Sequence, residues 1–288
     1  MHKNLRVSIV IPVYNEGERL AACLDAITEQ TVAPFEVIVV DNNSDDDTVA
    51  VARRYPFVRV LRESRQGVVF ARDAGFDAAR GDIIGRIDAD TLISNGWVAA
   101  AQHIFTSTTL DAVSGSVHYY DISLAKPINT LDLHARKRLA RLLEHDVYLF
   151  GANMALLRPV WQSVRRRMCR SGGLHEDFDL AIHLQEAGFA VGFDERLHAG
   201  VSSRRIDTDF VPFMHYVSMS PKTYGAHCLS AQRYMYPLVA LAVLGYLPGR
   251  VLHRAFDSEL GRFSVRHLLL AAPAGSRVDP TANVSSLD

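Results

Sequence analysis

Residues 81–90 have the sequence GDIIGRIDAD, in which an apolar run ends directly in two carboxylates. Its three isoleucines predict a strand of the kind that is buried in a parallel sheet. Asp88 and Asp90 follow where that strand should end, and carboxylates in this position are suited to hold Mg²⁺ or Mn²⁺ against a phosphate. Acidic pairs at strand ends are common, so the surrounding sequence decides what this pair does.

Three more strand patterns precede this stretch. Apolar, β-branched runs at residues 7–12, 36–40 and 58–61 are separated by segments with helical periodicity. Strands that alternate with helices predict an α/β fold built on a parallel, doubly wound sheet. Asn15 and Ser44 have the residue types and positions of helix N-caps, so we expect helices to begin directly after them.

Two further polar loops should lie at the same edge of this sheet, where open α/β sheets bind their ligands. Their sequences are PVYNE, residues 12–16, and DNNS, residues 41–44. A tyrosine can stack on a base and a carboxylate can accept the imide N–H of uracil, so these loops suit a pyrimidine nucleotide. Neither a G-x-G-x-x-G nor a P-loop motif follows the first strand, which argues against a dinucleotide site and leaves the charge of a diphosphate to a metal.

The composition narrows the classes of protein to which this chain can belong. The 288 residues are 48% hydrophobic and 22% charged with a net charge of −1, which is ordinary for a globular protein and implies no bulk attraction to nucleic acid. Cys23, Cys169 and Cys228 are odd in number and outside any C-x-x-C spacing. We therefore expect reduced thiols in a cytosolic protein, with neither a disulfide framework nor a zinc site.

The three loops, taken in order with their strands, resemble the family 2 glycosyltransferases of GT-A fold. The resemblance rests on residues 7–16, 40–48 and 81–90 and extends over about residues 5–205. It implies a nucleotide-diphosphosugar transferase fold, an α/β/α sandwich with a mostly parallel central sheet. It also implies inverting sugar transfer with Mg²⁺ or Mn²⁺ as cofactor, of the kind used in building cell-envelope polysaccharides.

The resemblance assigns roles to individual residues. Asp90 matches the metal ligand on the diphosphate, and Asp88 matches the acid nearest the nucleotide ribose and a second metal ligand. Asp73 stands where family members often have Asn. The residues implied to bind the nucleotide-sugar are Pro12, Tyr14, Glu16, Asp41, Asn43, Arg72 and Asp88.

The second half should supply the acceptor side. Residues 176–186 predict a helix, and Asp177 in its first turn resembles the catalytic base of the family. The alternative is that Asp177 is an ordinary first-turn acid stabilised by the helix dipole. His198 is implied to be a further metal ligand, although a lone histidine is often structural. Arg204 and Arg205 could clamp a diphosphate or form a surface turn, and Gly151 could let backbone approach the sugar or mark a strand bulge.

The apolar run at residues 238–247 is bracketed by Pro237 and Pro248. It is shorter than the ~20 residues that span a bilayer. It predicts either a buried core helix or a segment that lies in the membrane interface.

The predicted organisation is a GT-A catalytic domain followed by smaller pieces. The catalytic domain should occupy residues 1–215, with a nucleotide-sugar half at 5–105 and an acceptor half at 106–215. A C-terminal helical segment, associated with membrane or with a second copy, should occupy residues 216–270, and a disordered tail residues 271–288.

The predicted function is an inverting, metal-dependent transfer from a nucleotide-diphosphate sugar, by family habit a UDP-sugar, to a lipid-linked or saccharide acceptor. The alternatives are a nucleotidyltransferase that makes an NDP-sugar and a non-catalytic nucleotide-sugar-binding module. No signal-peptide pattern precedes the first strand. We therefore expect a cytoplasmic protein without a nucleic-acid partner, with contact at the inner face of the membrane and a homodimer both left open.

Overall fold

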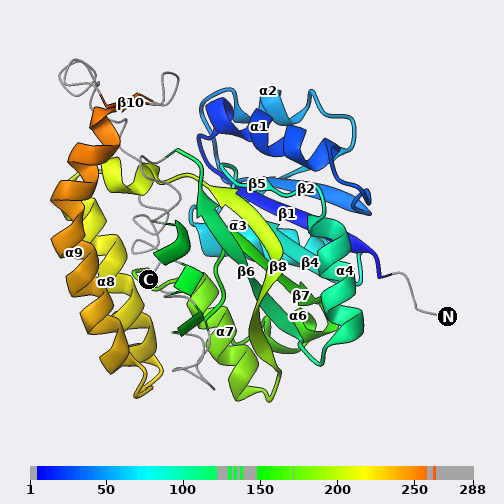
Figure 1. Cartoon of the computed structure of the whole chain (residues 1–288). Coiled ribbons are helices and arrows are strands. Elements are labelled where there is room, and N and C mark those ends of the chain that lie inside the picture. Colours follow the sequence, from blue (N-terminus) through cyan, green and yellow to red (C-terminus); the bar gives the residue numbers. More distant parts are fainter. Residues whose placement is uncertain are drawn as a thin grey trace.

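The structure, a computed structural model, is built on one eight-stranded sheet (Figure 1). It describes residues 5–121, 129–131, 133–134, 137–138, 148–170, 172–257 and 262–263. The strand order is β3-β2-β1-β4-β7-β6-β8-β5. The bounds are β1 (Val7–Val13), β2 (Glu36–Asp41), β3 (Val58–Arg62), β4 (Ile83–Ile87), β5 (Leu92–Ile93), β6 (Ala112–Tyr119), β7 (Asn153–Leu157) and β8 (Val191–Val201). The predicted 271–288 tail lies outside the described residues.

The N-terminal half of the sheet is parallel, as the continuous apolar runs predicted. β1 pairs in parallel with β2 and with β4, and β2 pairs in parallel with β3. Every residue of β2 and β4 is buried, because helices cover both faces of the sheet.

The second half of the sheet mixes directions in a way that brings more loops to one edge. β7 is antiparallel to both β4 and β6, so its first residue lies at the edge where those two strands end. β8 runs parallel to β6 and therefore also ends there. The loops before β7 and after β1, β2, β4, β6 and β8 consequently meet at one edge of the sheet.

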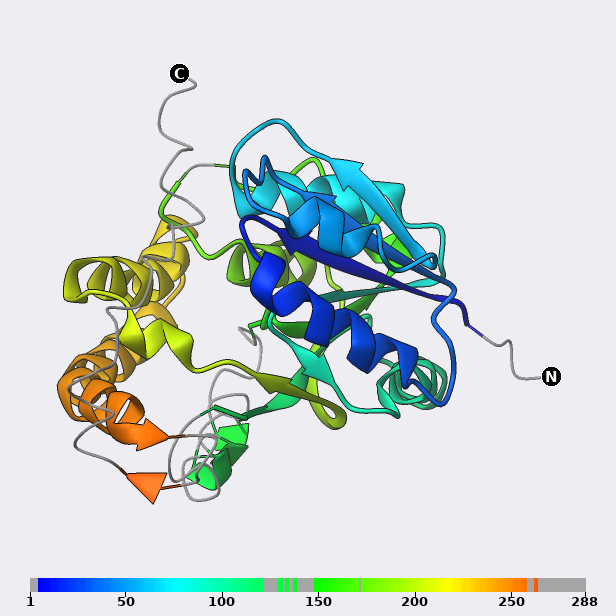
Figure 2. The same ribbon diagram turned by 90° about the horizontal axis from the view of Figure 1, so that it is seen from above.

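Helices form layers on the two faces, which completes the α/β/α sandwich (Figure 2). α1 (Gly17–Thr28), α2 (Thr48–Ala52) and α4 (Trp97–Ser107) bury their apolar side chains on one face. α3 (Val68–Ala78), α6 (Arg158–Val164) and α7 (Glu176–Glu186) do so on the other. α7 begins and ends where its sequence pattern predicted.

The predicted N-caps of the first two helices are wrong. Asn15 has a left-handed backbone (φ 52°), and α1 begins two residues later at Gly17. Its first N–H groups are satisfied from outside the helix: Glu16 N–H donates to Thr48 Oγ1 at 2.8 Å and Gly17 N–H to Asp46 Oδ2 at 3.1 Å. Ser44 likewise accepts the N–H of Asn15 and does not begin α2, which starts at Thr48. The N–H groups at these positions thus bond to residues far along the chain and not to side chains of a local capping box.

The C-terminal part is an antiparallel pair of helices beside the sandwich (Figure 1). It consists of α8 (Phe210–Ala226) and α9 (Gln232–Ala255), preceded by the short helix η1 (Arg204–Asp207) and followed by β9 (Phe256–Asp257) and β10 (Arg262–Phe263). The predicted boundary at residue 215 therefore falls inside α8.

α9 is longer than the sequence predicted. Pro237 and Pro248 lie within its 24 residues and do not bracket it, and by length and composition alone this helix is long and apolar enough to cross a membrane. Its inner side buries Met235 and Tyr246, and the Tyr246 hydroxyl donates to the carbonyl of Thr208 at 2.7 Å. The apolar run is therefore no buried core helix, because all five leucines of α9 are exposed on its outer side: Leu238, Leu241, Leu244, Leu247 and Leu252.

Candidate active site

Arg86 joins the two halves of the site. It is the penultimate residue of β4 and is 4% exposed, and its Nη2 lies 3.0 Å from Asp88 Oδ1 and 3.0 Å from Glu176 Oε1. The arginine therefore ties the strand-end acid to the first turn of α7, which lies 90 residues further along the chain. A buried arginine of this kind is retained because two carboxylates neutralise it.

Gly151 provides the room for this arginine. A Cβ at residue 151 would lie 1.2 Å from Arg86 Nη1, so only glycine fits beside the guanidinium. The same residue donates its backbone N–H to Asp177 Oδ2 at 2.7 Å. Gly151 thus brings the start of β7, the arginine and α7 together.

Asp177 lies in the first turn of α7 and is 8% exposed. Its Oδ1 accepts the N–H of Phe178 at 2.9 Å. Burial, and then the adjacent Glu176 carboxylate, raise the pKa of Asp177 to about 7, although Arg86 and the two N–H groups oppose the shift. A carboxylate near its titration midpoint at neutral pH is suited to accept a proton from a substrate.

Arg204 follows β8 and reaches across the same edge of the sheet. Its Nε donates to Asp90 Oδ2 at 2.8 Å and its Nη2 donates to Glu16 Oε1. Burial opposes a raised pKa, but the Asp90 and Glu16 carboxylates outweigh it and hold the pKa of Arg204 above its ordinary value. The loops after β1, β4 and β8 therefore meet at one guanidinium.

Two residues that follow β6 hold this arrangement in place. The hydroxyl of Tyr120 donates to the carbonyl of Asp90 at 3.0 Å. Asp121 accepts the N–H of Ser203 at 2.7 Å and the hydroxyl of Ser202, which fixes the loop that carries Arg204.

The loop after β2 has a fixed backbone. Asp41 is buried and accepts the N–H of Ser44 through Oδ1 at 3.0 Å. Asn43 has φ 67° and donates to the carbonyl of Ser64 at 2.8 Å. Pro12 and Tyr14, partly exposed at the end of β1 and just after it, lie beside this loop, where Asn42 N–H bonds to the carbonyl of Val13.

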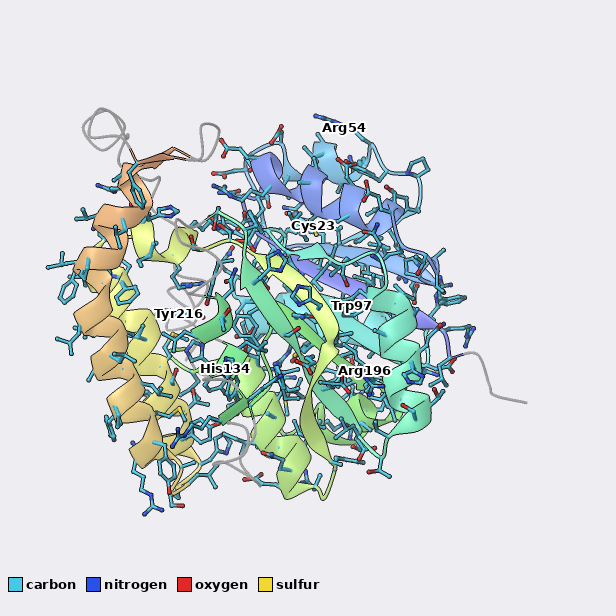
Figure 3. All side chains as sticks on the ribbon, viewed as in Figure 1. Cys23, Arg54, Trp97, His134, Arg196 and Tyr216 are labelled. Atoms are coloured by element: carbon cyan, nitrogen blue, oxygen red, sulfur yellow. The ribbon has the colours of Figure 1, made fainter. Side chains whose placement is uncertain are left out.

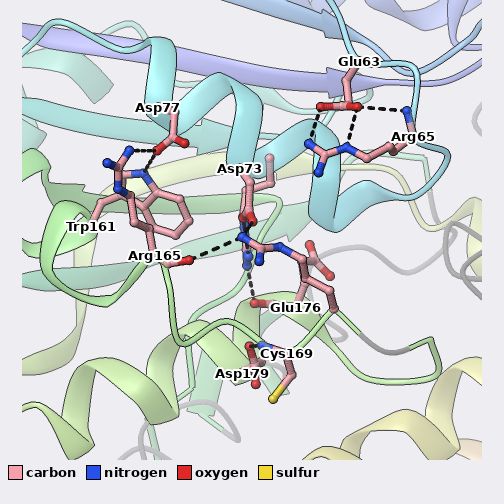
Figure 4. A network of polar contacts seen from close by, with 11 residues as sticks. Glu63, Arg65, Asp73, Asp77, Trp161, Arg165, Cys169, Glu176 and Asp179 are labelled. Atoms are coloured by element: carbon pink, nitrogen blue, oxygen red, sulfur yellow. Dashed lines mark hydrogen bonds and ion pairs between the residues drawn. The ribbon is translucent and has the colours of Figure 1, made fainter. Parts of the chain in front are cut away.

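Arg72 does not occupy the position expected of a nucleotide ligand. Its side chain is fully buried, with Nη2 2.7 Å from Asp73 Oδ1 and Nη1 bonded to the carbonyl of Glu176. Asp73, which lies on α3, is also bonded to Arg170 Nη2 at 3.1 Å (Figure 4). We therefore reassign Arg72 to positioning the start of α7, because a paired guanidinium with no exposure is not accessible to a nucleotide.

His198 lies on β8 with both ring nitrogens engaged. Nδ1 is 2.8 Å from Ser116 Oγ, and Nε2 is 3.0 Å from Nδ1 of His118, whose ring stacks on it at 4.8 Å. Burial, and then His118, lower the pKa of His198. In the part of the chain that the structure describes, no cluster of three or more potential metal ligands joins His198 to Asp88 and Asp90. The structure thus gives no support to His198 as a ligand.

Asp88, Asp90 and Glu16 offer the ligand type of a hard divalent cation, although in the part of the chain that the structure describes they do not form a cluster of three close ligand atoms. All three are carboxylates, the ligand type that Mg²⁺ and Mn²⁺ prefer. Glu16 Oε2 is buried and has no hydrogen-bond partner among the described residues, which leaves an oxygen that a cation could satisfy. At present Arg204 supplies the positive charge beside Asp90 and Glu16.

The sequence pattern did not single out Arg86 or Tyr120, and it included Glu176 in the motif around Asp177 without a role of its own. The one available signal for Arg86 was a charged residue inside an otherwise apolar strand, two positions before an acid. A buried cation at that place needs carboxylate partners, but no pattern says that one of them is Glu176.

Comparisons with known proteins agree with this geometry. The model of the family "Glycosyl transferase family 2" matches residues 8–162. Glycosyltransferase AglE of Haloferax volcanii is 34% identical over 120 residues, which cover 39% of this chain and 40% of AglE. The undecaprenyl-phosphate 4-deoxy-4-formamido-L-arabinose transferase of Pseudomonas syringae is 40% identical over 93 residues, 29% of this chain and 28% of that protein. The matches thus span well under half the length of these relatives.

A solved structure extends the likeness of the fold to nearly the whole chain. The mannosyltransferase PcManGT from Pyrobaculum calidifontis, solved with GDP-Man and Mn²⁺, superposes with a TM-score of 0.61 at 20% identity and covers 93% of this chain and 79% of that one. The family match covers more than half of the sequence, from β1 into α6. This chain therefore belongs to glycosyl transferase family 2 and has the GT-A fold.

Proposed function

We propose that this protein is an inverting, metal-dependent glycosyltransferase that moves a sugar from a UDP-sugar to a hydroxyl or phosphate oxygen of a lipid-linked acceptor. The observation that carries the proposal is the Arg86 bridge. The Arg86 guanidinium joins Asp88 to Glu176. Asp88 would face the donor diphosphate, and Glu176 is next to the proposed base. The sequence up to residue 105 would bind the nucleotide-sugar, and the following half would bind the acceptor.

Asp177 is the proposed base. Its carboxylate takes the proton of the acceptor hydroxyl while that oxygen attacks the anomeric carbon. The new C–O bond forms on the face opposite the breaking bond to phosphate, and UDP leaves with the electron pair, so the configuration inverts. An acceptor that is already an ionised phosphate would need no base, and Asp177 would then only orient it. The N–H groups of Gly151 and Phe178 hold Asp177 in place for either role.

The diphosphate would be bound opposite this base. Asp88 and Asp90 would hold Mg²⁺ or Mn²⁺, which neutralises charge on the departing diphosphate when bound. Mn²⁺ is present in the complex of PcManGT, which supports this assignment by similarity of fold. Arg204 can change partners from Asp90 to a phosphate oxygen, because a guanidinium binds both groups with the same geometry.

The nucleotide would bind at the ends of β1 and β2. Tyr14 is proposed to stack on the base, and Asp41 Oδ2 to accept the imide N–H of uracil while Oδ1 keeps its bond to Ser44. Guanine also presents an N–H to a carboxylate, and PcManGT carries GDP-Man, so a binding screen of UDP against GDP decides the nucleotide.

The outer face of α9 supports a lipid-linked acceptor. Leucines on this face are exposed beside Tyr234 and Tyr236, as in a helix that lies in the interface of a bilayer. One relative has undecaprenyl-phosphate in its name. A cytoplasmic enzyme held at the inner face of the membrane would meet such an acceptor in the plane of the lipid.

Product analysis tests the proposal. The protein is incubated with UDP-sugars, Mn²⁺ and either a polyprenyl phosphate or an oligosaccharide, and separately with UTP and a sugar 1-phosphate. Release of UDP with a glycosylated acceptor is expected. Formation of pyrophosphate would identify a nucleotidyltransferase instead, and binding without turnover of any donor would identify a binding module.

A further inference from the structure

Four side chains of the types that bind metals meet beside α7, where Asp179 follows Asp177 by two residues. They come from three segments: Cys169 from the loop after α6, Asp179 and His183 from α7, and His227 from the C-terminal end of α8. One ligand atom of each lies within 4.8 Å of all the others. Figure 4 shows Cys169 and Asp179 side by side, with the N–H of Cys169 bonded to Asp179 Oδ2 at 2.9 Å.

The spacing of these atoms matches a tetrahedral metal site. Around a zinc ion with ligands at roughly 2.0–2.3 Å, neighbouring ligand atoms are about 3.3–3.6 Å apart. Here Cys169 Sγ lies 3.8 Å from His183 Nε2 and 3.9 Å from His227 Nε2. Asp179 Oδ1 lies 3.5 Å from His183 Nε2 and 2.9 Å from His227 Nε2. These four of the six edges are within a few tenths of an ångström of the ideal edge, and the other two pairs of ligand atoms lie within 4.8 Å of each other.

The surrounding groups orient the same atoms toward the centre. His183 Nδ1 is 3.1 Å from Glu186 Oε2, and His227 Nδ1 is 3.8 Å from Glu186 Oε1. At 3.1 Å the carboxylate of Glu186 bonds to Nδ1 of His183, which leaves Nε2 of His183 to bind a metal. Such a carboxylate is the usual outer partner of a zinc-bound histidine. Asp179 uses Oδ2 for the backbone, so Oδ1 is available as a single ligand.

A hydrogen-bonded cluster without metal explains the 2.9 Å contact between His227 Nε2 and Asp179 Oδ1, but it explains less of the remaining geometry. The 3.5 Å between His183 Nε2 and Asp179 Oδ1 is too long for a hydrogen bond, and the two S···N distances are near the limit for a weak one. A divalent cation would instead bind the thiolate, the carboxylate and both imidazoles at once.

We propose that Cys169, Asp179, His183 and His227 bind a structural zinc ion. Sulfur, nitrogen and oxygen ligands together favour zinc over the hard cations expected at Asp88 and Asp90. Four protein ligands close the coordination sphere, which is the arrangement of a structural site. The ion joins the loop before α7, α7 itself and the α8–α9 pair, and so fixes the helix that carries Asp177 without taking part in transfer.

Metal content tests the site. The full chain is purified without a histidine tag, dialysed against a weak chelator and analysed for all transition metals. We expect about one zinc per chain in the wild type and in Asp90→Ala, and loss of that zinc in Cys169→Ser and in His227→Gln. Cys228→Ser, which removes the exposed cysteine next to His227 in sequence, is the matched control and should keep it. No zinc in the wild type, or full retention in Cys169→Ser, overturns the proposal.

Cobalt substitution tests the ligands themselves. Co²⁺ in the wild type should give a thiolate-to-cobalt charge-transfer band and the intense visible bands of a tetrahedral site, and both should persist in Cys228→Ser. Weak octahedral bands in the wild type would contradict the assignment. Removal of the metal should also lower the melting temperature of the wild type, because a ligand that binds only the folded state stabilises it. These results do not depend on whether the protein transfers sugar.

Discussion

Arg204 donates its Nε to Asp90 Oδ2 at 2.8 Å, so the carboxylate that should bind the metal is bonded to an arginine in the free protein. The same guanidinium bonds to Glu16. Two carboxylates from the ends of different strands would repel each other without this cation. The arginine therefore stabilises the free site and competes with a metal for Asp90.

Arg204→Gln should increase the affinity of the nucleotide-free protein for Mn²⁺ by about tenfold or more. Removal of one positive charge within hydrogen-bond distance of Asp90 frees the carboxylate and lowers repulsion toward a cation. The dissociation constant can be measured by electron paramagnetic resonance titration. Arg196→Gln is the control, because it removes an arginine of β8 that is paired with Asp194 of the same strand (Figure 3). Unchanged or weaker Mn²⁺ binding in Arg204→Gln would contradict competition for Asp90.

Asp90→Asn should lower turnover by roughly 10²-fold or more and abolish the increase in UDP affinity caused by Mn²⁺. Neutralisation of this carboxylate removes the charge that holds the cation beside the diphosphate. Calorimetric titration of UDP with and without Mn²⁺ separates the metal-dependent part of binding. Asp82→Asn, at the other end of β4, serves as the control. If Mn²⁺ still tightens UDP binding to Asp90→Asn, the metal is held elsewhere.

Asp177→Asn should lower turnover of a hydroxyl acceptor by roughly 10²–10⁴-fold, the range for loss of a general base. The affinity for UDP should stay within a few-fold of wild type, because an asparagine can still accept the N–H of Gly151. The measurements are kcat and the UDP dissociation constant. Turnover close to wild type would show that Asp177 only orders the first turn of α7 and that the base lies elsewhere.

Gly151→Ala should lower the free energy of unfolding by about 1–3 kcal/mol and reduce turnover, because the added Cβ displaces Arg86. Chemical denaturation and kcat are the measurements. Gly245→Ala is the matched control: it lies in α9 with open space around it, and alanine there should stabilise the helix. A Gly151→Ala protein with unchanged stability and turnover would show that Arg86 can move without cost.

The parallel half of the fold could be predicted because its strands are fully buried. Continuous β-branched runs between helical segments leave few alternatives, and the ends of those strands located Asp41, Asp88 and Asp90. Strand direction in the second half followed from pairings such as β4 with β7, about which local sequence says nothing.

Contacts between distant segments account for what the sequence did not predict. The cap of α1 comes from Thr48 and Asp46, although Asn15 had the local pattern of a cap.

Interior prolines normally end a helix, so Pro237 and Pro248 were interpreted as boundaries of the apolar run. In the structure α9 continues through both of them.

The proposed zinc site could not be predicted from local sequence for the same reason. Cys169 and His227 are 58 residues apart and outside any zinc spacing, so the sequence argued against zinc. Only the pairing of α8 with α7 brings them together.

The exposed face of α9 should bind membranes. Leu241, Leu244 and Leu247 are 67%, 76% and 67% exposed, and burial of a leucine in an apolar environment is favourable by about 1.5–3 kcal/mol. Replacement of all three by Gln should therefore lower partitioning onto anionic vesicles by about tenfold or more, since 1.4 kcal/mol corresponds to a factor of ten. Flotation of the full chain with such vesicles measures the effect.

The packing of α9 makes this variant informative. The helix is held by its other side, where Tyr246 bonds to Thr208 and Arg254 bonds to Asp207, so the triple variant should fold and should use a water-soluble acceptor at the wild-type rate. Phe57→Gln, which removes an exposed apolar side chain beside β3, should float like the wild type. If neither the wild type nor the triple variant floats, and light scattering shows a dimer that only the triple variant loses, α9 binds a second copy of the chain.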